Sequence, residues 1–449
     1  MDERRNPNRV DQREIRRQLY LKRKRKHQQK QLLVFGSLIL VLILLIVLLM
    51  RACAPVAEKK PVETKPAAPA PTEPVVQSTS ANVLAVGDIL MHQGIIDSVR
   101  QSDGSYDFSG LFANLKDEFT AADLACACME TILVENESDT NNGLPLYGTT
   151  SSLAPAIQAA GFDVVAQATE HAYDKGLDAV RFTKSTWNGL GVSAIGIHDS
   201  EADAQTVTVR EVNGIKIAFL NYTYADSETV KARENYAVDY LESENAIAQQ
   251  IAAAKQQSDI VIVFAHWGEM TTYEANDFQK TWAQFFADNG VGAVIGSHTH
   301  TLQPTAQITG ANGNTMPVFY SLGNYMTHMS RYYNMLGGMA ELTVTKDESG
   351  TRVSAYRLVP LVEVIDTTGS GFRFYTVKLA DYTSDMAKSH QLDGTSVDNI
   401  QELYQAILPL EQPPVESNPG ESSSDPGTPS ESAAPPDPNT PSQSESSQP

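Results

Sequence analysis

The chain has 449 residues and carries 34 Lys and Arg residues against 54 Asp and Glu residues, which gives a formal net charge of −20 at pH 7. A charge of this size and sign argues against nucleic acid as a partner and favours a soluble, self-repelling domain. Three cysteines are present, and Cys126 and Cys128 lie two residues apart in an apolar run. This pattern excludes a disulfide framework, and we expect these two cysteines simply to pack in the core.

The N-terminal region has the pattern of a membrane anchor. Residues 1–30 are strongly basic and predict a cytoplasmic segment. They lead into "LLVFGSLILVLILLIVLLM", an uncharged run close to the roughly 20 residues that a helix needs to cross a bilayer, and we predict a transmembrane helix over residues 31–51. The following "MRACAP" offers no small-residue cleavage site, so the anchor is expected to stay. The prediction is a single-pass cell-membrane protein with a cytoplasmic N-terminus and an extracellular C-terminal domain.

Composition divides the rest of the chain into a folded domain and flanking segments. Residues 52–80 are rich in Pro and Ala and predict a semi-extended linker. Residues 411–449 consist mainly of Pro, Ser, Glu, Asp and Gly, which cannot bury enough apolar surface to fold, and predict a disordered tail. We assign the main folded domain to residues 81–365 and a C-terminal extension of that domain to residues 366–410.

Within this domain, short apolar runs alternate with helical stretches, which is typical of an α/β fold. From residue 339 to about residue 379 the pattern changes to strand, hairpin and strand, with "ESG" as the turn. The predicted strands cover residues 82–88, 123–130, 162–169, 216–223, 259–268, 291–298 and 317–324, and the predicted helices cover residues 111–119, 153–161, 176–191, 243–257 and 277–290.

Side chains that can bind metal occupy the ends of the predicted strands, where functional residues gather in an open α/β sheet. Some of them have a structural explanation when taken alone: Asp88 as a turn or cap residue, Glu130 as a capping acid, and His171 as a histidine satisfied by Asp174. Their joint placement instead favours a site for a divalent ion such as Zn, Mn or Fe. The candidate metal ligands are Asp88, Glu130, Glu170, His266, His298 and His300.

The histidines give the strongest signal in this set. His266 ends a buried apolar run, where an imidazole needs a partner that offsets the cost of its burial. His298 and His300 lie two residues apart at the end of another run, and on an extended chain their side chains would share one side. His92, four residues after Asp88, is a possible further ligand, but we interpret His92, His198 and His328 as loop or surface histidines.

The order and spacing of several short blocks resemble the CapA family, which is associated with capsule synthesis and poly-γ-glutamate production and is distantly related to calcineurin-like metallophosphatases. The blocks are "AVGDILMH", "ACMETIL", "QATEHAYDKG", "FAHWGE" and "GSHTHTLQP", followed by "YSLGNY". The resemblance covers about residues 81–330 and implies a metallophosphatase-like α/β sandwich behind the transmembrane helix.

The resemblance also implies roles for single residues. The six candidate ligands would hold one or two divalent ions, His171 or His300 would handle the proton of a leaving group, and Trp267 and Asn324 would bind substrate. Cys128 and Glu170 stand where the family has Asn. A carboxylate at position 170 can still bind a cation, but it would repel an incoming phosphate.

These features favour a membrane-anchored extracellular protein that acts in the biosynthesis of capsule or of a poly-γ-glutamate-type surface polymer through a divalent-metal, hydrolase-like site. The expected partners are an anionic surface polymer, the membrane and membrane subunits of a polymer synthase. Two other hypotheses stay open. One is a surface metal-dependent phosphoesterase unrelated to capsule, and the other is a non-catalytic, polymer-binding accessory subunit, which the departures at Cys128 and Glu170 favour.

Overall fold

Two β-sheets packed against each other form the centre of the fold in this computed structural model, which describes residues 78–143, 146–224, 231–369 and 371–408. The predicted cytoplasmic segment, transmembrane helix and C-terminal tail lie outside the described residues, as does the predicted linker except for residues 78–80. Within the described ranges, no helix is both long enough and apolar enough to cross a membrane.

The first sheet combines a parallel half with an antiparallel half. Its strand order is β17-β16-β15-β1-β2-β6-β7, and the short strand β14 pairs in parallel with β1. The parallel half consists of β1 (Thr79–Ile89), β2 (Leu124–Met129), β6 (Val164–Ala166) and β7 (Ser193–Ile195), and the other strands are β14 (Asn324–Met326), β15 (Leu336–Asp347), β16 (Gly350–Asp366) and β17 (Arg373–Lys378).

The second sheet has the order β12-β13-β11-β10-β9-β8 and is parallel at its centre. A third, small sheet has the order β3-β5-β4. The strands of the second sheet are β8 (Thr208–Val212), β9 (Ile215–Thr223), β10 (Ile260–His266), β11 (Ala293–Ser297), β12 (Thr305–Thr309) and β13 (Thr315–Phe319), and those of the third are β3 (Leu133–Val134), β4 (Asn141–Gly143) and β5 (Leu146–Thr150).

Alternate residues of the central strands face two different layers of the core. In β10, Ile260, Ile262 and Phe264 pack between the two sheets, whereas Val261, Val263 and Ala265 pack under the helices of the second sheet. Because successive side chains of a strand point to opposite faces, a strand covered on both faces reads as a continuous apolar run. This explains why "IVIVFA" lacks the alternation of a half-exposed strand.

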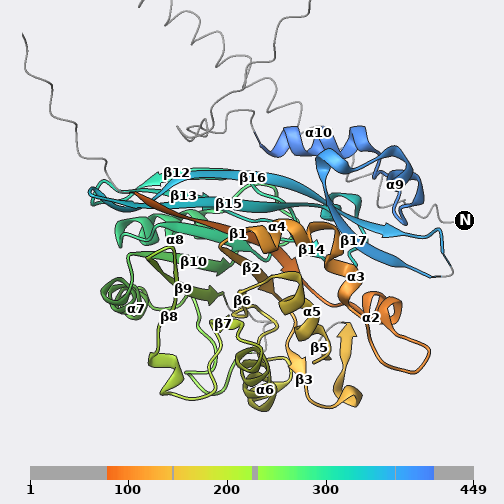
Figure 1. The fold of residues 1–449 in the computed structure, drawn as a ribbon, viewed down its shortest axis with the longest axis horizontal. Coiled ribbons are helices and arrows are strands. Elements are labelled where there is room, and N and C mark those ends of the chain that lie inside the picture. The colour runs from red at the N-terminus through yellow and green to blue at the C-terminus, as the bar shows by residue number, and fades with distance from the viewer. Residues whose placement is uncertain (1–77, 144–145, 225–230, 370, 409–449) are drawn as a thin grey trace, which may run out of the picture. The chain divides into compact units, whose positions relative to one another are not determined.

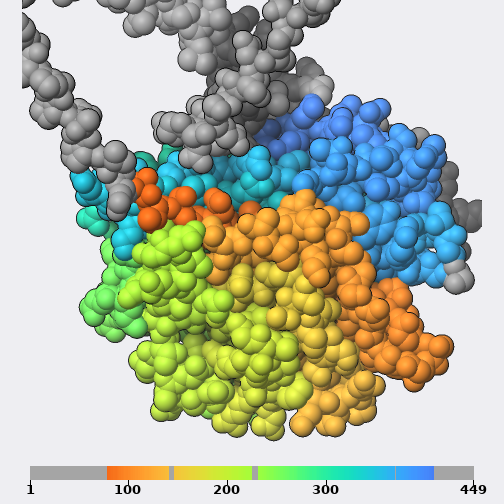
Figure 2. Space-filling view, in the orientation of Figure 1, coloured from red at the N-terminus to blue at the C-terminus, as the bar shows by residue number. Residues whose placement is uncertain are grey.

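Helices cover both outer faces and complete a layered α/β sandwich (Figure 1). The first sheet is covered by α2 (Gln93–Val99), α3 (Ser109–Phe112), α4 (Lys116–Ala121), α5 (Leu153–Ala160) and α6 (Gly176–Gly189), and the second by α7 (Glu244–Gln257) and α8 (Asp277–Asp288). Near the C-terminus, α9 (Ser384–Ser389) and α10 (Val397–Ile407) lie against the antiparallel strands of the first sheet (Figure 2).

The predicted α/β sandwich is confirmed, and the predicted elements differ from the structure mainly at their ends. The expected helix over residues 111–119 is observed as α3, a 3-10 turn and α4. The expected strand over residues 317–324 is split, because β13 ends at Phe319 and the chain then crosses to the first sheet as β14. The boundary predicted between residues 365 and 366 falls just before the last residue of β16.

Candidate metal centre

The candidate metal ligands come together where the parallel strands of both sheets end. Asp88 is the penultimate residue of β1, Glu130 directly follows β2, and His266 is the last residue of β10. Glu170 lies in the turn that follows β6. The list is completed by His298 and His300, which follow β11. The carboxyl ends of parallel strands within a sheet meet at one edge, and here the edges of the two sheets face each other.

His298 and His300 reach the site through an unusual backbone rather than an extended one. Their φ angles are 91° and 53°, in the left-handed region that residues other than glycine rarely adopt. Both side chains enter one site, as predicted, but the predicted reason, alternation along an extended chain, is wrong. Backbone strain of this kind occurs where the surrounding structure requires a side chain to point in one direction.

Glu130 lies at the centre of the cluster. Its Oε1 atom is 3.6 Å from Nε2 of His266 and 3.7 Å from Nε2 of His300. Both carboxylate oxygens are buried and have no hydrogen-bond partner among the described residues. An unpaired carboxylate in the interior is costly unless a cation or a donor compensates it. This is the arrangement expected of a carboxylate that binds metal.

Two groups of potential ligands share Glu130. One consists of Asp88, Glu130 and His300, and the other of Glu130, Glu170, His266 and His298; in each group the ligand atoms lie within 4.8 Å of one another. In the second group, Nδ1 of His298 is 3.2 Å from Oε1 of Glu170 and 3.3 Å from Nε2 of His266. Glu130 would therefore be available as a ligand to both groups if each held an ion.

The electrostatics of the cluster also suit a cation. Burial raises the pKa of Asp88 to about 6, and burial together with the charge of Asp88 raises the pKa of Glu130 well above its usual value. Burial and the nearby His298 lower the pKa of His266, and burial lowers that of His300 to about 3. These imidazoles are therefore neutral at pH 7, which is the form that binds metal. The residues present thus fit a divalent ion.

His171 lies beside the cluster with a carboxylate partner. Its Nδ1 is 2.8 Å from Oδ2 of Asp174, and its Nε2 is 3.9 Å from Oε1 of Glu170. The same Asp174 oxygen accepts a hydrogen bond of 2.7 Å from the backbone N–H of Tyr147, whose ring packs edge-on against His171. Asp174 is held in place and in turn orients the imidazole. The ring of His92 also packs edge-on against Tyr147; His92 lies in the loop between β1 and α2, as predicted, and is half-buried there.

Of the two predicted substrate contacts, Asn324 lies at the cluster and Trp267 does not. Trp267 is fully buried in the core under α8, and its indole N–H donates to the carbonyl of Tyr320, so its side chain does not face the cluster. Asn324 is also buried, and its Oδ1 lies 2.9 Å from Nδ1 of His300 while its Nδ2 donates to the carbonyl of Asn334. Its contacts orient His300.

The predicted packing role holds for Cys126, which lies between the sheets, but Cys128 contacts the polar cluster. Its Sγ is 3.0 Å from Oγ of Ser297 and 3.9 Å from Nδ1 of His266. Cys126, Cys128 and Glu130 succeed one another at intervals of two and therefore share a face. That spacing from a candidate ligand is the signal in the sequence that could have identified Cys128. Tyr224, whose ring packs against His298, had no such signal.

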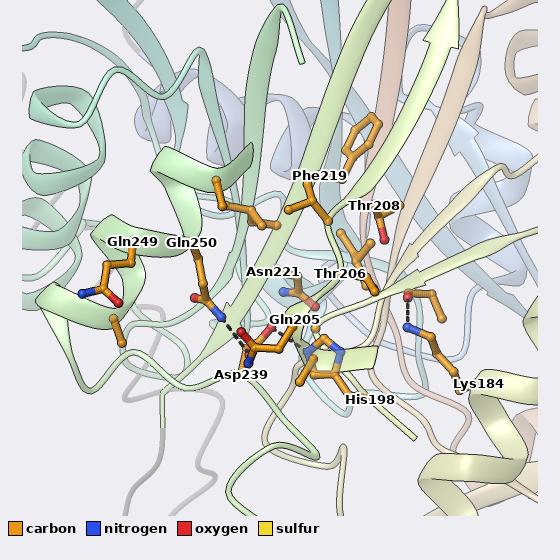
Figure 3. Close-up of a pocket in the computed structure, with 18 residues that line it drawn as sticks. Lys184, His198, Gln205, Thr206, Thr208, Phe219, Asn221, Asp239, Gln249 and Gln250 are labelled. Carbon is orange, nitrogen blue, oxygen red and sulfur yellow. Dashed lines mark hydrogen bonds and ion pairs between the residues drawn. The ribbon is translucent and has the colours of Figure 1, made fainter. Parts of the chain in front are cut away.

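A separate cavity of about 400 Å³ lies beside β7, β9 and α7 (Figure 3). In its wall, Nε2 of His198 is 2.9 Å from Oδ2 of Asp239, and Nδ1 is 3.6 Å from Oδ2 of Asp203. Nζ of Lys184 is 3.1 Å from the same Asp203 oxygen. His198 therefore lies in the loop that follows β7, as predicted, but it is buried among charged partners rather than at the surface.

Comparison with known proteins gives relatives in two bacilli. The chain is 27% identical over 259 residues to the PGA biosynthesis protein CapA of Bacillus subtilis, covering 56% of this chain and 66% of that protein. It is 26% identical over 251 residues to the capsule biosynthesis protein CapA of Bacillus anthracis, covering 54% and 58% of the two chains. The match thus spans less than two thirds of the length of either relative.

Solved structures with a similar arrangement include two bacterial enzymes. The NAD nucleotidase of Haemophilus influenzae superposes with a TM-score of 0.42 at 13% identity, covering 74% of this chain and 60% of that one. The calcineurin-like phosphoesterase YfkN of Bacillus subtilis superposes with a TM-score of 0.38 at 14% identity, covering 73% and 98%. The model of the bacterial capsule synthesis protein family PGA_cap matches residues 82–329, more than half of the chain, and the protein belongs to that family.

Proposed function

We propose that this protein acts in the biosynthesis of capsule or of a poly-γ-glutamate-type surface polymer through a divalent-metal, hydrolase-like site. The observation that carries the proposal is Glu130, a fully buried carboxylate without a hydrogen-bond partner among the described residues. Nε2 atoms of two histidines lie within 3.7 Å of it. Membership of the PGA_cap family supports the link to capsule.

Asp88, Glu130 and His300 would hold one ion, and Glu130, Glu170, His266 and His298 would hold a second. Mixed imidazole and carboxylate ligands suit Zn, Mn or Fe. When bound, such an ion would polarise the scissile bond and activate water.

Hydrogen bonds distinguish the roles of His171 and His300, the two candidates for proton transfer. Nδ2 of Asn324 donates to a backbone carbonyl, so its Oδ1 must accept from Nδ1–H of His300. Nε2 of His300 therefore carries a lone pair toward Glu130 and is suited to bind a cation. His171, paired with Asp174 and partly exposed, remains to move the proton of the leaving group.

The proposal can be tested with the purified chain loaded with Mn, Zn or Fe and supplied with poly-γ-glutamate or with a chromogenic phosphomonoester. We expect metal-dependent turnover of the polymer that is lost in Glu130→Gln, and a lower kcat at similar KM in His171→Asn. Turnover of the phosphomonoester alone would support the phosphoesterase hypothesis. Absence of metal-dependent turnover of either substrate would contradict a hydrolytic role.

A specific observation favours the non-catalytic accessory role as a second candidate. Glu170 places a carboxylate 3.2 Å from His298, where it would repel a phosphate approaching the cluster. This role predicts polymer binding that survives His298→Ala, measured by co-sedimentation of the chain with poly-γ-glutamate.

We further propose that residues 31–51 anchor the protein in the cell membrane, with residues 1–30 in the cytoplasm and the folded domain outside. The support is the uncharged run and its basic flank. An anchor at this position would hold the domain where an anionic polymer leaves the membrane. The chain should stay with membranes during alkaline carbonate extraction, and recovery in the supernatant would contradict the proposal.

A further inference from the structure

Ser297 and Cys128 contact His266 on the side away from Glu130. Oγ of Ser297 lies 3.0 Å from Nδ1 of His266 and 3.0 Å from Sγ of Cys128. Sγ and a carboxylate oxygen of Asp88 lie within 4.8 Å of each other. Ser297 and Cys128 are both buried, so these contacts are shielded from water.

The proton positions in this chain of contacts follow from the requirement that His266 binds a cation. Nε2 of His266 faces Glu130 and His298, and it must be unprotonated to act as a ligand. Nδ1 then carries the proton and donates to Oγ of Ser297. The Ser297 hydroxyl in turn directs its own proton to the sulfur of Cys128, whose thiol proton can point to the carboxylate of Asp88.

We propose that Cys128 and Ser297 are positioning residues that join His266 and Asp88, and so set the affinity of the metal centre. The inference rests on the proposed function, since it assigns a role toward the proposed ion. His266 belongs to one ligand group and Asp88 to the other, so a chain of contacts between them orients both groups together. Partners that orient a ligand from behind typically contribute about 10–100-fold to metal affinity.

Direct binding of the ion by Cys128 is the competing arrangement. Asp88, Cys128 and His266 also form a group of ligand atoms within 4.8 Å of one another, and Oδ1 of Asp88 has no hydrogen-bond partner among the described residues. However, that group would use Nδ1 of His266, which already contacts Ser297 at 3.0 Å. The positioning role keeps Nε2 of His266 for the ion and leaves Nδ1 in its shorter contact with Ser297.

The test is metal affinity, measured by chelator competition with Zn²⁺ and Co²⁺ on the purified chain. We expect Ser297→Ala and Cys128→Ala each to weaken binding by about 10–100-fold. The double variant should be hardly weaker than the worse single variant, because both break the same chain of contacts. Cys128→Ser keeps a donor and an acceptor and should recover most of the loss. Cys126→Ala is the matched control, since it removes a buried thiol deeper on the same face, and it should leave the affinity within about twofold.

Two results would overturn the inference while leaving the proposed metal centre intact. One is unchanged affinity in Ser297→Ala and Cys128→Ala. The other is a sulfur-to-cobalt charge-transfer band in the Co²⁺-loaded protein that disappears in Cys128→Ser, because it would show that the thiolate binds the ion itself. A wild-type chain that binds neither Zn²⁺ nor Co²⁺ would instead remove the proposed function, and the inference with it.

Discussion

At the scale of single residues, the site differs from its surroundings by burying acids that its protein neighbours do not neutralise. Glu130 and Asp88 are both fully buried, and each has at least one oxygen without a hydrogen-bond partner among the described residues. Glu363, another buried carboxylate of the first sheet, receives hydrogen bonds from the N–H and hydroxyl of Thr327. The protein itself supplies hydrogen-bond donors for Glu363, whereas Glu130 and Asp88 keep oxygens that a bound cation could compensate.

Glu170 provides a prediction at this scale. Replacing it by Asn removes a negative charge beside His298 while keeping an oxygen ligand. Two unit charges about 4 Å apart interact by ~4 kcal/mol at the effective dielectric of a protein surface. Removing even part of this repulsion should raise kcat/KM for a phosphomonoester by roughly 10-fold or more.

The comparison should be made at equal metal occupancy, with the exposed Glu201→Gln as control. Glu201→Gln should leave kcat/KM unchanged. If Glu170→Asn also left it unchanged, the charge of Glu170 would not be what limits hydrolysis of the phosphomonoester.

At the scale of elements, the site depends on how closely β1 and β14 approach each other. The backbone N–H of Asp88 donates to the carbonyl of Gly323 at 2.9 Å, and β14 begins at Asn324, which orients His300. A Cβ atom on Gly87 would lie 1.9 Å from that carbonyl oxygen. Glycine at position 87 therefore allows the two strands to bring Asp88 and Asn324 together.

Gly87→Ala should separate these strands. We expect a loss of stability of about 1–3 kcal/mol or more, as for other cases of overpacking, and weaker metal binding because Asp88 and His300 would both shift. Urea unfolding and chelator competition measure the two effects. Gly110→Ala, where a Cβ atom meets nothing within 4 Å, should lose neither. An unaltered metal affinity in Gly87→Ala would contradict the dependence of the site on this contact.

A second prediction at this scale concerns His198, which joins the segment after β7 to Asp203 and Asp239. Burial alone would lower its pKa, but the nearby carboxylates of Asp203 and Asp239 raise the pKa to about 9 from an ordinary 6.5. Because the pKa is higher in the folded than in the unfolded state, charged His198 stabilises the folded protein. This stabilisation is complete below about pH 6.5 and is lost as the pH rises through about 9.

The pKa difference corresponds to on the order of 3 kcal/mol of stability. The wild type should therefore have a higher free energy of unfolding than His198→Gln at pH 6. This difference should decrease by on the order of 3 kcal/mol between pH 6 and pH 10. Urea unfolding at both pH values measures it. A difference that stays constant with pH would show that His198 is not charged in the folded protein.

At the scale of the whole molecule, the sequence predicted the layers better than the connections between them. Apolar runs and amphipathic stretches mark the strands and helices because burial acts on each element locally. Partners of strands are set by distant contacts: β1 pairs with β15, in which Ala81 lies opposite Val344. Nothing in either run specifies that pairing.

The same limit applies to the candidate site. Strand ends rich in His, Asp and Glu predicted which residues meet, because parallel strands of a sheet end at one edge. The side-chain directions of Trp267 and Asn324 and the left-handed backbone of His298 depend on packing around them, so the sequence could not give them. Cys128 is predicted as a core residue because it lies in the apolar run of β2, and the run does not show that its last residues reach the polar cluster.

The central claim is that the strand ends form a divalent-metal centre, and elemental mass spectrometry tests it most directly. The purified 449-residue chain and its Glu130→Gln variant would be loaded with Mn, Zn or Fe and freed of unbound metal. We predict about one or two ions for each wild-type chain and a clear loss in Glu130→Gln, with the variant still folded in the presence of chelator. A wild-type chain without metal after loading, or equal metal content in the two proteins, would contradict the account.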